Sequence, residues 1–361
     1  MPTTDNPRKL LLVPVVLLAG WLSGCGSVVM NPSGDIAAQQ SHLIVVSTVL
    51  MLLIVVPVIA LVVIFAWRYR QSNSDAGGAV YSPDWAHSTQ LELVIWSAPL
   101  LIIIALGAVT WISTHTLDPY RALRRLDANR PVGAGTKPLV VEVVALDWKW
   151  LFIYPELGIA TVNELAAPID RPISFKITAS SVMNSFFVPA LAGQIYAMPG
   201  MQTQMHAVIN KPGVFDGFSA NYSGAGFSGM RFKFHGLSPA EFDLWVEKAK
   251  ASGQSLGREA YLQLEKPSQR DPIKRYAVVA PDLYDAILDR CVDSSKMCMH
   301  QMAAIDARGL GSVAGYAVAR QRWSPGRGDA PALPYVKAMV CTSDDPASQI
   351  VSQLEPLALK P

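Results

Sequence analysis

The sequence predicts two membrane-spanning helices, then an all-β sandwich, then a helical C-terminal extension. Two long uncharged apolar runs predict the helices, since each can cross a hydrocarbon layer of about 30 Å at about 1.5 Å per residue. Short runs rich in Val, Ile, Phe and Tyr, separated by Pro and Gly, predict the sandwich. With 30 Lys and Arg against 28 Asp and Glu, the 361-residue chain offers no electrostatic surface for nucleic acid.

The N-terminus has the pattern of a secretory signal. Arg8 and Lys9 precede the apolar run Leu10–Ala19, which is shorter than a membrane span, and the run is followed by "LSGC" ending at Cys25. This resembles a bacterial lipobox, which implies removal of residues 1–24 and lipidation of Cys25. An ordinary signal peptide with an incidental cysteine is the alternative.

The two apolar runs define a hairpin. The first span is predicted at 43–66, with Pro57 expected to kink it, and the second at 93–113. Four arginines follow the second span and two lie in the loop 67–92, a count that favours a cytoplasmic C-terminal side. A lipidated start must lie outside, however, and large domains translocate largely regardless of charge. We therefore expect residues 25–42 in the periplasm, the loop 67–92 in the cytoplasm, and the rest of the chain in the periplasm.

The region 138–236 is large enough to bury its own core. It ends in a stretch with the glycine punctuation of a metal-binding loop but with neither cysteine nor histidine, "GFSANYSGAGFSGM" at 217–230. The extended runs that predict strands are "LVVEVVALDWKWLFIY", "GIATVNELAAP", "PISFKITAS", "QTQMHAVIN" and "GMRFKFHG".

A two-helix hairpin followed by this β domain resembles subunit II of the haem-copper terminal oxidases. In the branch that oxidises cytochrome c, the domain is a cupredoxin with a binuclear copper centre. The last loop of that domain reads G-x-C-x-E-x-C-G-x-x-H-x-x-M, and a further histidine lies in S-x-x-x-H-S-F. Thiolate and imidazole ligands suit such a centre. In this sequence the corresponding positions are Asn184, Ser219, Asn221, Ser223, Phe227 and Met230.

Of those positions only Met230 keeps a copper ligand, because serine, asparagine and phenylalanine cannot replace thiolates and imidazoles. We therefore expect a cupredoxin-like sandwich that lacks the copper site. The same departure, and segments such as "DWKWLFIYPELGIATVNELAAP", resemble subunit II of bo-type ubiquinol oxidases.

That resemblance implies a subunit of a proton-pumping respiratory complex that oxidises ubiquinol and reduces oxygen to water. It implies haems and copper in a partner subunit I, further partners in subunits III and IV and membrane lipid, and no redox centre in this chain. The implied location is the bacterial inner membrane. Two alternatives remain: subunit II of a cytochrome c oxidase with an atypical copper site, and a lipidated periplasmic copper-binding protein.

Four further residues have candidate roles. Glu92 lies in "HSTQLELVIWSAP", at the cytoplasmic start of the second span. The resemblance places a glutamate here at the entrance of a proton pathway into subunit I; a solvated carboxylate favoured by the helix dipole is the alternative. The segment "ALDWKW" contains Trp148 and Trp150, which match an aromatic patch and are expected to pack on subunit I. Asp147 is an interface candidate or a strand-end charge in water.

Residues 237–361 are expected to form an aromatic-rich helical segment and a mobile tail, which becomes rich in Pro and Gly from Arg320. "SPAEFDLWVEKAKASG" has apolar residues at helical spacing and resembles an aromatic-rich C-terminal motif of these subunits. Farther on, "CVDSSKMCMHQM" predicts a disulfide between Cys291 and Cys298 or plain packing; a cuprous copper site is the alternative. The apolar positions of the helix are Phe242, Trp245, Val246 and Ala249.

Overall fold

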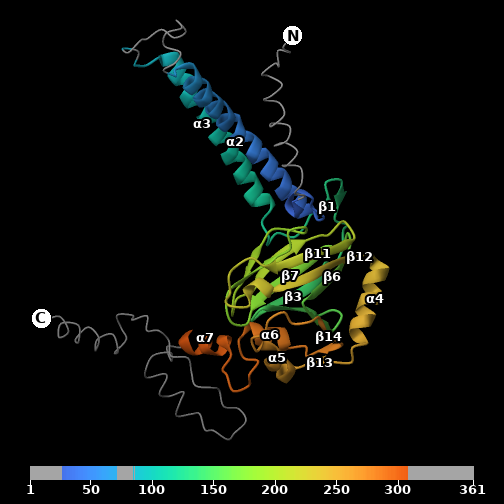
Figure 1. Ribbon diagram of the computed structural model, residues 1–361. Helices are drawn as coiled ribbons and strands as arrows, with labels where there is room; N and C mark the ends of the chain where they lie inside the picture. The colour runs from blue at the N-terminus through green and yellow to red at the C-terminus, as the bar shows by residue number, and fades with distance from the viewer. Residues whose placement is uncertain (1–26, 71–83, 85, 308–361) are drawn as a thin grey trace, which may run out of the picture. The chain divides into compact units, whose positions relative to one another are not determined.

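The computed structural model describes residues 27–70, 84 and 86–307 (Figure 1). The chain forms two compact units. The first comprises Met1–Arg121 with Pro189–Gly193, and the second comprises Ala122–Val188 with Gln194–Pro361. The expected lipidation site Cys25 and the expected tail from Arg320 lie outside the described residues.

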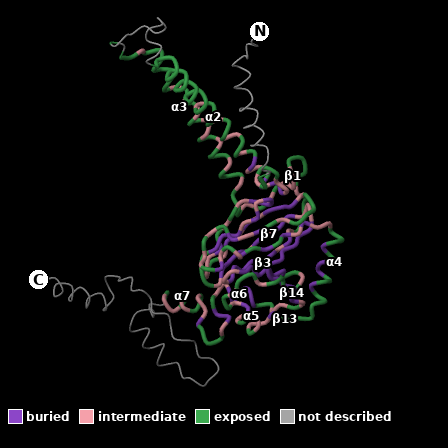
Figure 2. Tube along the Cα trace, in the orientation of Figure 1, coloured by how far each residue is buried: buried purple, intermediate pink, exposed green. Residues whose placement is uncertain are grey.

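The first unit contains the two apolar helices, α2 (Asp35–Arg68) and α3 (Thr89–Thr116), preceded by a short 3-10 turn, η1 (Val28–Met30). Both helices are long and apolar enough to cross a membrane. Most of their residues are exposed and are coloured green in Figure 2, which suits a lipid-facing surface. The helices contain the predicted spans and extend beyond them, so both ends of the predicted loop 67–92 are helical.

The second unit is built on two sheets, and together with the apolar helices it confirms the predicted fold class. One sheet has the order β10-β7-β3-β4-β5-β14 and the other the order β6-β12-β11-β8-β9. All neighbours are antiparallel except β3 with β7 and β12 with β6. The strands are β3 (Leu139–Leu146), β4 (Lys149–Tyr154), β5 (Ile159–Val162), β6 (Glu164–Pro168), β7 (Ile173–Ala179), β8 (Asn184–Phe187), β9 (Ile195–Ala197), β10 (Thr203–Ala207), β11 (Gly213–Ser219), β12 (Arg231–Leu237) and β14 (Lys274–Tyr276).

The sequence runs missed part of these sheets. Strands β8, β9 and most of β11 were not predicted, and the glycine-rich stretch 217–230 begins inside β11 rather than in a loop. Strand β14 pairs with β5, so the sheet continues past the predicted boundary at residue 236. The C-terminal extension therefore completes the sandwich as well as adding helices to it.

Aromatic side chains fill the space between the sheets. The rings of Phe186 and Phe232 stack with centroids 5.5 Å apart, and Trp150 meets both of them edge-on. Phe152 lies 4.9 Å from Phe232, and these aromatic residues are at most 2% exposed. Figure 2 shows this core in purple. Burial of several large rings in one layer supplies much of the hydrophobic stabilisation.

The predicted amphipathic helix is confirmed as α4 (Pro239–Lys250). Ser238 caps it, since its hydroxyl accepts from the backbone N–H of Glu241 while that carboxylate accepts from the Ser238 N–H. The four predicted apolar residues are the ones that the helix buries. The rest of the extension consists of β13 (Ser255–Leu256), α5 (Arg258–Glu265), β15 (Val278–Val279), α6 (Leu283–Leu288) and α7 (Met299–Ala307).

Two buried polar contacts hold this extension to the sheets. Arg275 of β14 donates to both carboxylate oxygens of Glu164 at 2.7 and 2.8 Å, and the Glu164 side chain is only 5% exposed. Lys149, 1% exposed, donates from Nζ to the Lys266 carbonyl at 2.8 Å. Burial lowers the pKa of this lysine. Both contacts join residues more than a hundred positions apart.

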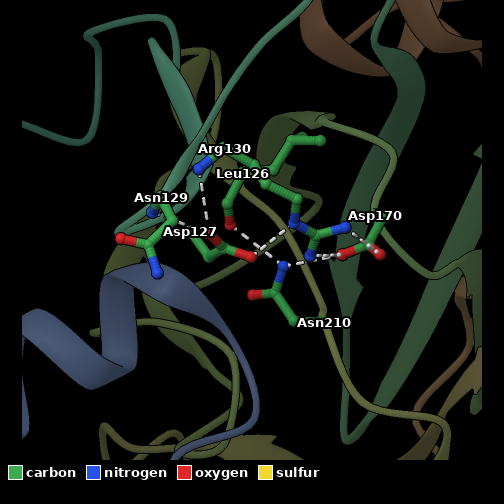
Figure 3. A network of polar contacts seen from close by, with 6 residues as sticks. All are labelled: Leu126, Asp127, Asn129, Arg130, Asp170 and Asn210. Atoms are coloured by element: carbon green, nitrogen blue, oxygen red, sulfur yellow. Dashed lines mark hydrogen bonds and ion pairs between the residues drawn. The ribbon is translucent and has the colours of Figure 1, made fainter.

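A small hairpin of β1 (Arg125–Asp127) and β2 (Arg130–Pro131) is fastened to the sandwich by the network in Figure 3. Arg130 donates to both carboxylate oxygens of Asp170 at 2.8 Å. Asn210 donates from Nδ2 to the Leu126 carbonyl at 2.9 Å and to Asp170 at 2.8 Å. The Arg130 guanidinium lowers the pKa of Asp170. The bidentate geometry holds the hairpin against the segment between β6 and β7.

Candidate functional site

The candidate site is the cluster of positions that corresponds to the copper site of the resembling family. Three segments bring it together: Asn184 begins β8, Ser219 ends β11, and the loop 220–226 leads through η3 (Phe227–Gly229) to Met230. Pairing of β8 with β11 sets Phe186 opposite Ser219, which brings the two strand ends together. The six positions are thus gathered at one end of the second sheet.

Three of the four polar side chains at these positions are hydrogen-bonded, whereas the Ser223 hydroxyl is buried without a partner among the described residues. The Ser219 hydroxyl lies 3.0 Å from Oδ1 of Asn184 and 3.2 Å from the Asn221 carbonyl, both of which can accept its proton. Asn184 donates from Nδ2 to the Val182 carbonyl at 3.1 Å. Asn184 and Ser219 are only 1% and 3% exposed, so these hydrogen bonds replace water.

The remaining positions complete the packing. Met230 is 1% exposed, and its carbonyl accepts from the Ser219 N–H at 3.2 Å. Phe227 packs edge-on against Tyr222 with ring centroids 5.7 Å apart. The donor set therefore consists of amides, hydroxyls, one thioether and one phenyl ring, with no thiolate or imidazole. This set does not fit a binuclear copper centre, which needs soft anionic sulfur and imidazole nitrogen.

Trp148 determines the shape of the loop. Its backbone is in the left-handed region at φ 67°, and its Nε1 donates to the Ser223 carbonyl at 3.0 Å. The ring lies so close to Gly226 that a Cβ there would stand 2.3 Å from a ring atom. A Cβ on Gly224 would stand 3.2 Å from the same ring. The glycines thus let the loop backbone close over an indole ring.

The two tryptophans predicted to contact subunit I have different places. Trp148 is half-buried, whereas Trp150 is 0% exposed in the aromatic core. Trp150 therefore cannot belong to a surface patch, and that prediction was wrong. It failed because the second sheet covers one face of β4 and the C-terminal extension packs on the other, so residues that alternate along β4 are all buried. Asp147 is half-buried and accepts a hydrogen bond from the Ser181 hydroxyl.

Around this end of the sandwich, large apolar side chains are exposed. Tyr222 is 75% exposed, Val182 45% and Met183 40%. Each is adjacent in sequence to a former ligand position or lies in the segment before β8. Scattered apolar residues are ordinary on a protein surface, but these are gathered on two neighbouring loops.

The other predicted residues lie away from this cluster. Glu92 is exposed in the first turn of α3, where a carboxylate is favoured by the helix dipole. Cys291 and Cys298 form a disulfide, so neither offers a thiolate to a metal. His300 interacts through Nδ1 with the Asp289 carboxylate. Sequence reasoning gave no role to Lys149, whose burial depends on a segment more than a hundred residues away.

Comparisons with known proteins agree with this architecture. The family model described as "Cytochrome C oxidase subunit II, periplasmic domain" matches residues 156–235, and the one described as "COX Aromatic Rich Motif" matches residues 250–295. The second match starts near the end of α4, so the motif lies mostly beyond the segment that the sequence pattern had suggested.

The chain is 50% identical over 269 residues to the cytochrome bo(3) ubiquinol oxidase subunit 2 of Pseudomonas putida, covering 74% of this chain and 82% of the relative. It is 49% identical over 286 residues to the ubiquinol oxidase subunit 2 of Acetobacter aceti, covering 78% and 90%. The periplasmic domain of subunit II of a cytochrome oxidase from Bradyrhizobium japonicum is 25% identical with a TM-score of 0.31, covering 31% of this chain and 94% of that chain. The chain therefore belongs to the cytochrome bo(3) ubiquinol oxidase subunit 2 family.

Proposed function

We propose that the chain is the structural subunit II of a proton-pumping respiratory ubiquinol oxidase and carries no redox centre of its own. The observation that carries this proposal is the fate of the former ligand positions. Asn184 and Ser219 hydrogen-bond each other where the related domain needs imidazole and thiolate. Relatives that match this chain over most of their length are named ubiquinol oxidase subunits.

Such a subunit does not need a copper centre. Ubiquinol is a membrane-soluble donor, so its electrons can enter the partner subunit I within the membrane. The haems and copper of that partner would supply the chemistry that reduces oxygen to water. The chain's own contribution would be binding: α2 and α3 against helices of the partner, and the β domain as a cap. Subunits III and IV and membrane lipid complete the expected partners.

The proposed topology starts with a signal of residues 1–24 and a lipid on Cys25, followed by periplasmic residues 25–42. Two spans then enclose the short cytoplasmic loop 67–92, so that the cupredoxin-like domain and the extension 237–361 lie in the periplasm of a bacterial inner membrane. The exposed apolar runs 43–66 within α2 and 93–113 within α3, which carry no charge, support this arrangement. An alkaline phosphatase fusion at residue 140 should be active, and an inactive fusion would reverse the topology.

Glu92 is proposed to stand at the entrance of a proton pathway into subunit I. Its place in the first turn of α3, at the mouth of a span, supports this role. Glu92→Ala should lower quinol-dependent turnover and proton pumping, whereas Glu92→Asp should retain more of both. Unchanged turnover and pumping in the alanine variant would leave only a solvated carboxylate.

We propose that five residues at this end of the sandwich contact the partner subunits: the half-buried Asp147 and Trp148 and the exposed Tyr222, Val182 and Met183. Exposed apolar groups gathered around a former electron-transfer site suit a protein interface. Val182→Asp with Tyr222→Ser should weaken recovery of the haem-containing partner with a tagged chain. The matched control is Leu244→Asp, a 71% exposed residue on α4.

Gentle purification of a tagged chain tests the main proposal. It should recover haem and quinol-oxidising activity, and copper should be accounted for by the partner alone. Recovery of the chain by itself with bound copper would favour the copper-binding protein instead. As a positive control for the metal assay, ligands can be restored with the combined substitutions N184H, S219C, N221E, S223C and F227H, which should add copper that the wild type lacks.

A further inference from the structure

A cavity of about 100 Å³ lies where the C-terminal extension meets the end of strand β7, apart from the former copper position. Four segments line it: Ser180 after β7, α5, α6 with Arg290 just beyond its end, and the loop closed by the disulfide between Cys291 and Cys298. All four belong to the second compact unit. These segments come together only in the tertiary fold, so no sequence motif predicts the cavity.

Two hydroxyl groups on the cavity residues are buried and have only each other as a partner among the described residues. Tyr261 is 1% exposed, and its hydroxyl and that of Ser180 interact with one another without reaching full hydrogen-bonding geometry. Burial raises the pKa of Tyr261, so the hydroxyl keeps its proton and can donate. At most one of the two hydroxyls can donate to the other, so at least one buried donor is left without an acceptor, which indicates that something else supplies it.

The charged side chains on the lining form no ion pairs with one another among the described residues. Arg290 and Lys296 are exposed, and in the described part of the chain neither makes an ion pair within hydrogen-bonding distance. Asp293 is already engaged, since it accepts from the N–H and hydroxyl of Ser295 at 2.9 and 2.7 Å. The neighbouring Asp147 accepts from Ser181. Two cations are therefore available to a ligand.

Glu265 is the one further acid on the lining. Burial raises its pKa, an effect that Asp147 and Asp293 strengthen and that Lys296 and Arg290 oppose. The raised pKa makes this carboxyl group easier to neutralise beside a bound anion than Asp293, whose pKa is lowered by its hydrogen bonds from Ser295. The lining thus combines two cations and two hydroxyls with two acids.

We propose that this cavity binds a small oxyanion, a phosphate or carboxylate group, between Arg290 and Lys296 at its rim and the hydroxyls of Tyr261 and Ser180 inside. Guanidinium and hydroxyl donors suit such oxygen acceptors, and the volume suits a group of this size. Val292, Asp293 and Lys296 lie between the bonded cysteines, so the disulfide holds one wall of the site in place.

The test uses the full-length chain in its purified oxidase complex, with inorganic phosphate and acetate as probes at constant ionic strength set with chloride. Phosphate binding is measured by ³¹P line broadening and by equilibrium dialysis at pH 7. R290Q/K296Q should weaken binding at least tenfold. The matched double variant K248Q/K250Q, which removes two exposed cations of α4, should bind as the wild type does.

Two further variants test whether the bound group is an anion and whether the Tyr261 hydroxyl donates to it. E265Q should bind phosphate as tightly as the wild type or several-fold more tightly, because an anion gains when a carboxylate is neutralised. Y261F should weaken binding a few-fold without lowering the melting temperature in chloride alone. Saturable acetate binding without phosphate binding would restrict the site to carboxylates. Equal phosphate signals in wild type and R290Q/K296Q, or loss of binding in E265Q, would overturn the proposal.

Discussion

The contact between Trp148 and Gly226 makes a sharp prediction about what shapes the loop. Gly226 has φ −92°, a backbone that alanine adopts freely, so Gly226→Ala brings no backbone strain. Its Cβ would instead lie 2.3, 2.5 and 2.6 Å from three atoms of the indole ring. Because the ring is held by its hydrogen bond to the Ser223 carbonyl, the loop or the ring must move. Overpacking of this kind costs about 1–3 kcal/mol.

The assay is urea unfolding of a soluble fragment covering residues 122–307, followed by circular dichroism. A double-mutant cycle with Trp148→Ala isolates the steric contact, and the penalty of Gly226→Ala should fall below about 0.5 kcal/mol once the ring is removed. Gly257→Ala is the control, because a Cβ there meets nothing within 4 Å. An equal penalty with and without the indole ring would refute the reasoning.

Two further predictions concern ionisable groups. Burial raises the pKa of Glu142 to about 7, so the folded state binds a proton more tightly than the unfolded state. Its stabilising contribution is present below about pH 4.5 and is lost as the pH rises through 7. Glu142→Gln should remove about 1 kcal/mol of this pH dependence, a value reduced because the side chain is partly exposed. Identical pH profiles of unfolding in the variant and the wild type would contradict this prediction. Arg275→Met leaves the buried Glu164 carboxylate without its bidentate partner and should cost about 3–5 kcal/mol in the same urea assay, whereas Glu164→Met with Arg275→Met should recover most of it. Equal losses in the single and double variants would show that packing, rather than charge, dominates there.

Several features were predictable because they are written along single elements. The apolar runs within α2 and α3 are uncharged and longer than a membrane needs, and the apolar face of α4 repeats at helical spacing. The absence of thiolates and imidazoles at the former ligand positions is a property of residue types alone. In each case the deciding quantity is local, either hydrophobicity, its period or the chemistry of a side chain.

Strand β11 shows why other features could not be predicted. Its sequence contains Gly213, Asp216 and Gly217, which are weak strand formers, and it lacks a clear alternation. The Phe232 ring of β12 lies where a Cβ on Gly217 would be, at 2.1 Å, so the glycine becomes intelligible only once the strands pair. The strand forms because its hydrogen bonds to β12 and β8 stabilise it.

The sequence by itself determined the two apolar helices, the β-rich domain and the loss of copper ligands. The tertiary structure alone decided that Trp150 belongs to the core while Trp148 shapes a loop, that β14 completes the sheet, and that four distant segments enclose a polar cavity. The physical reason is that the period of hydrophobic residues along the sequence shows which face of one helix or strand is buried. Contacts between distant elements, and the buried charges and hydroxyls that depend on them, arise only when the chain closes on itself.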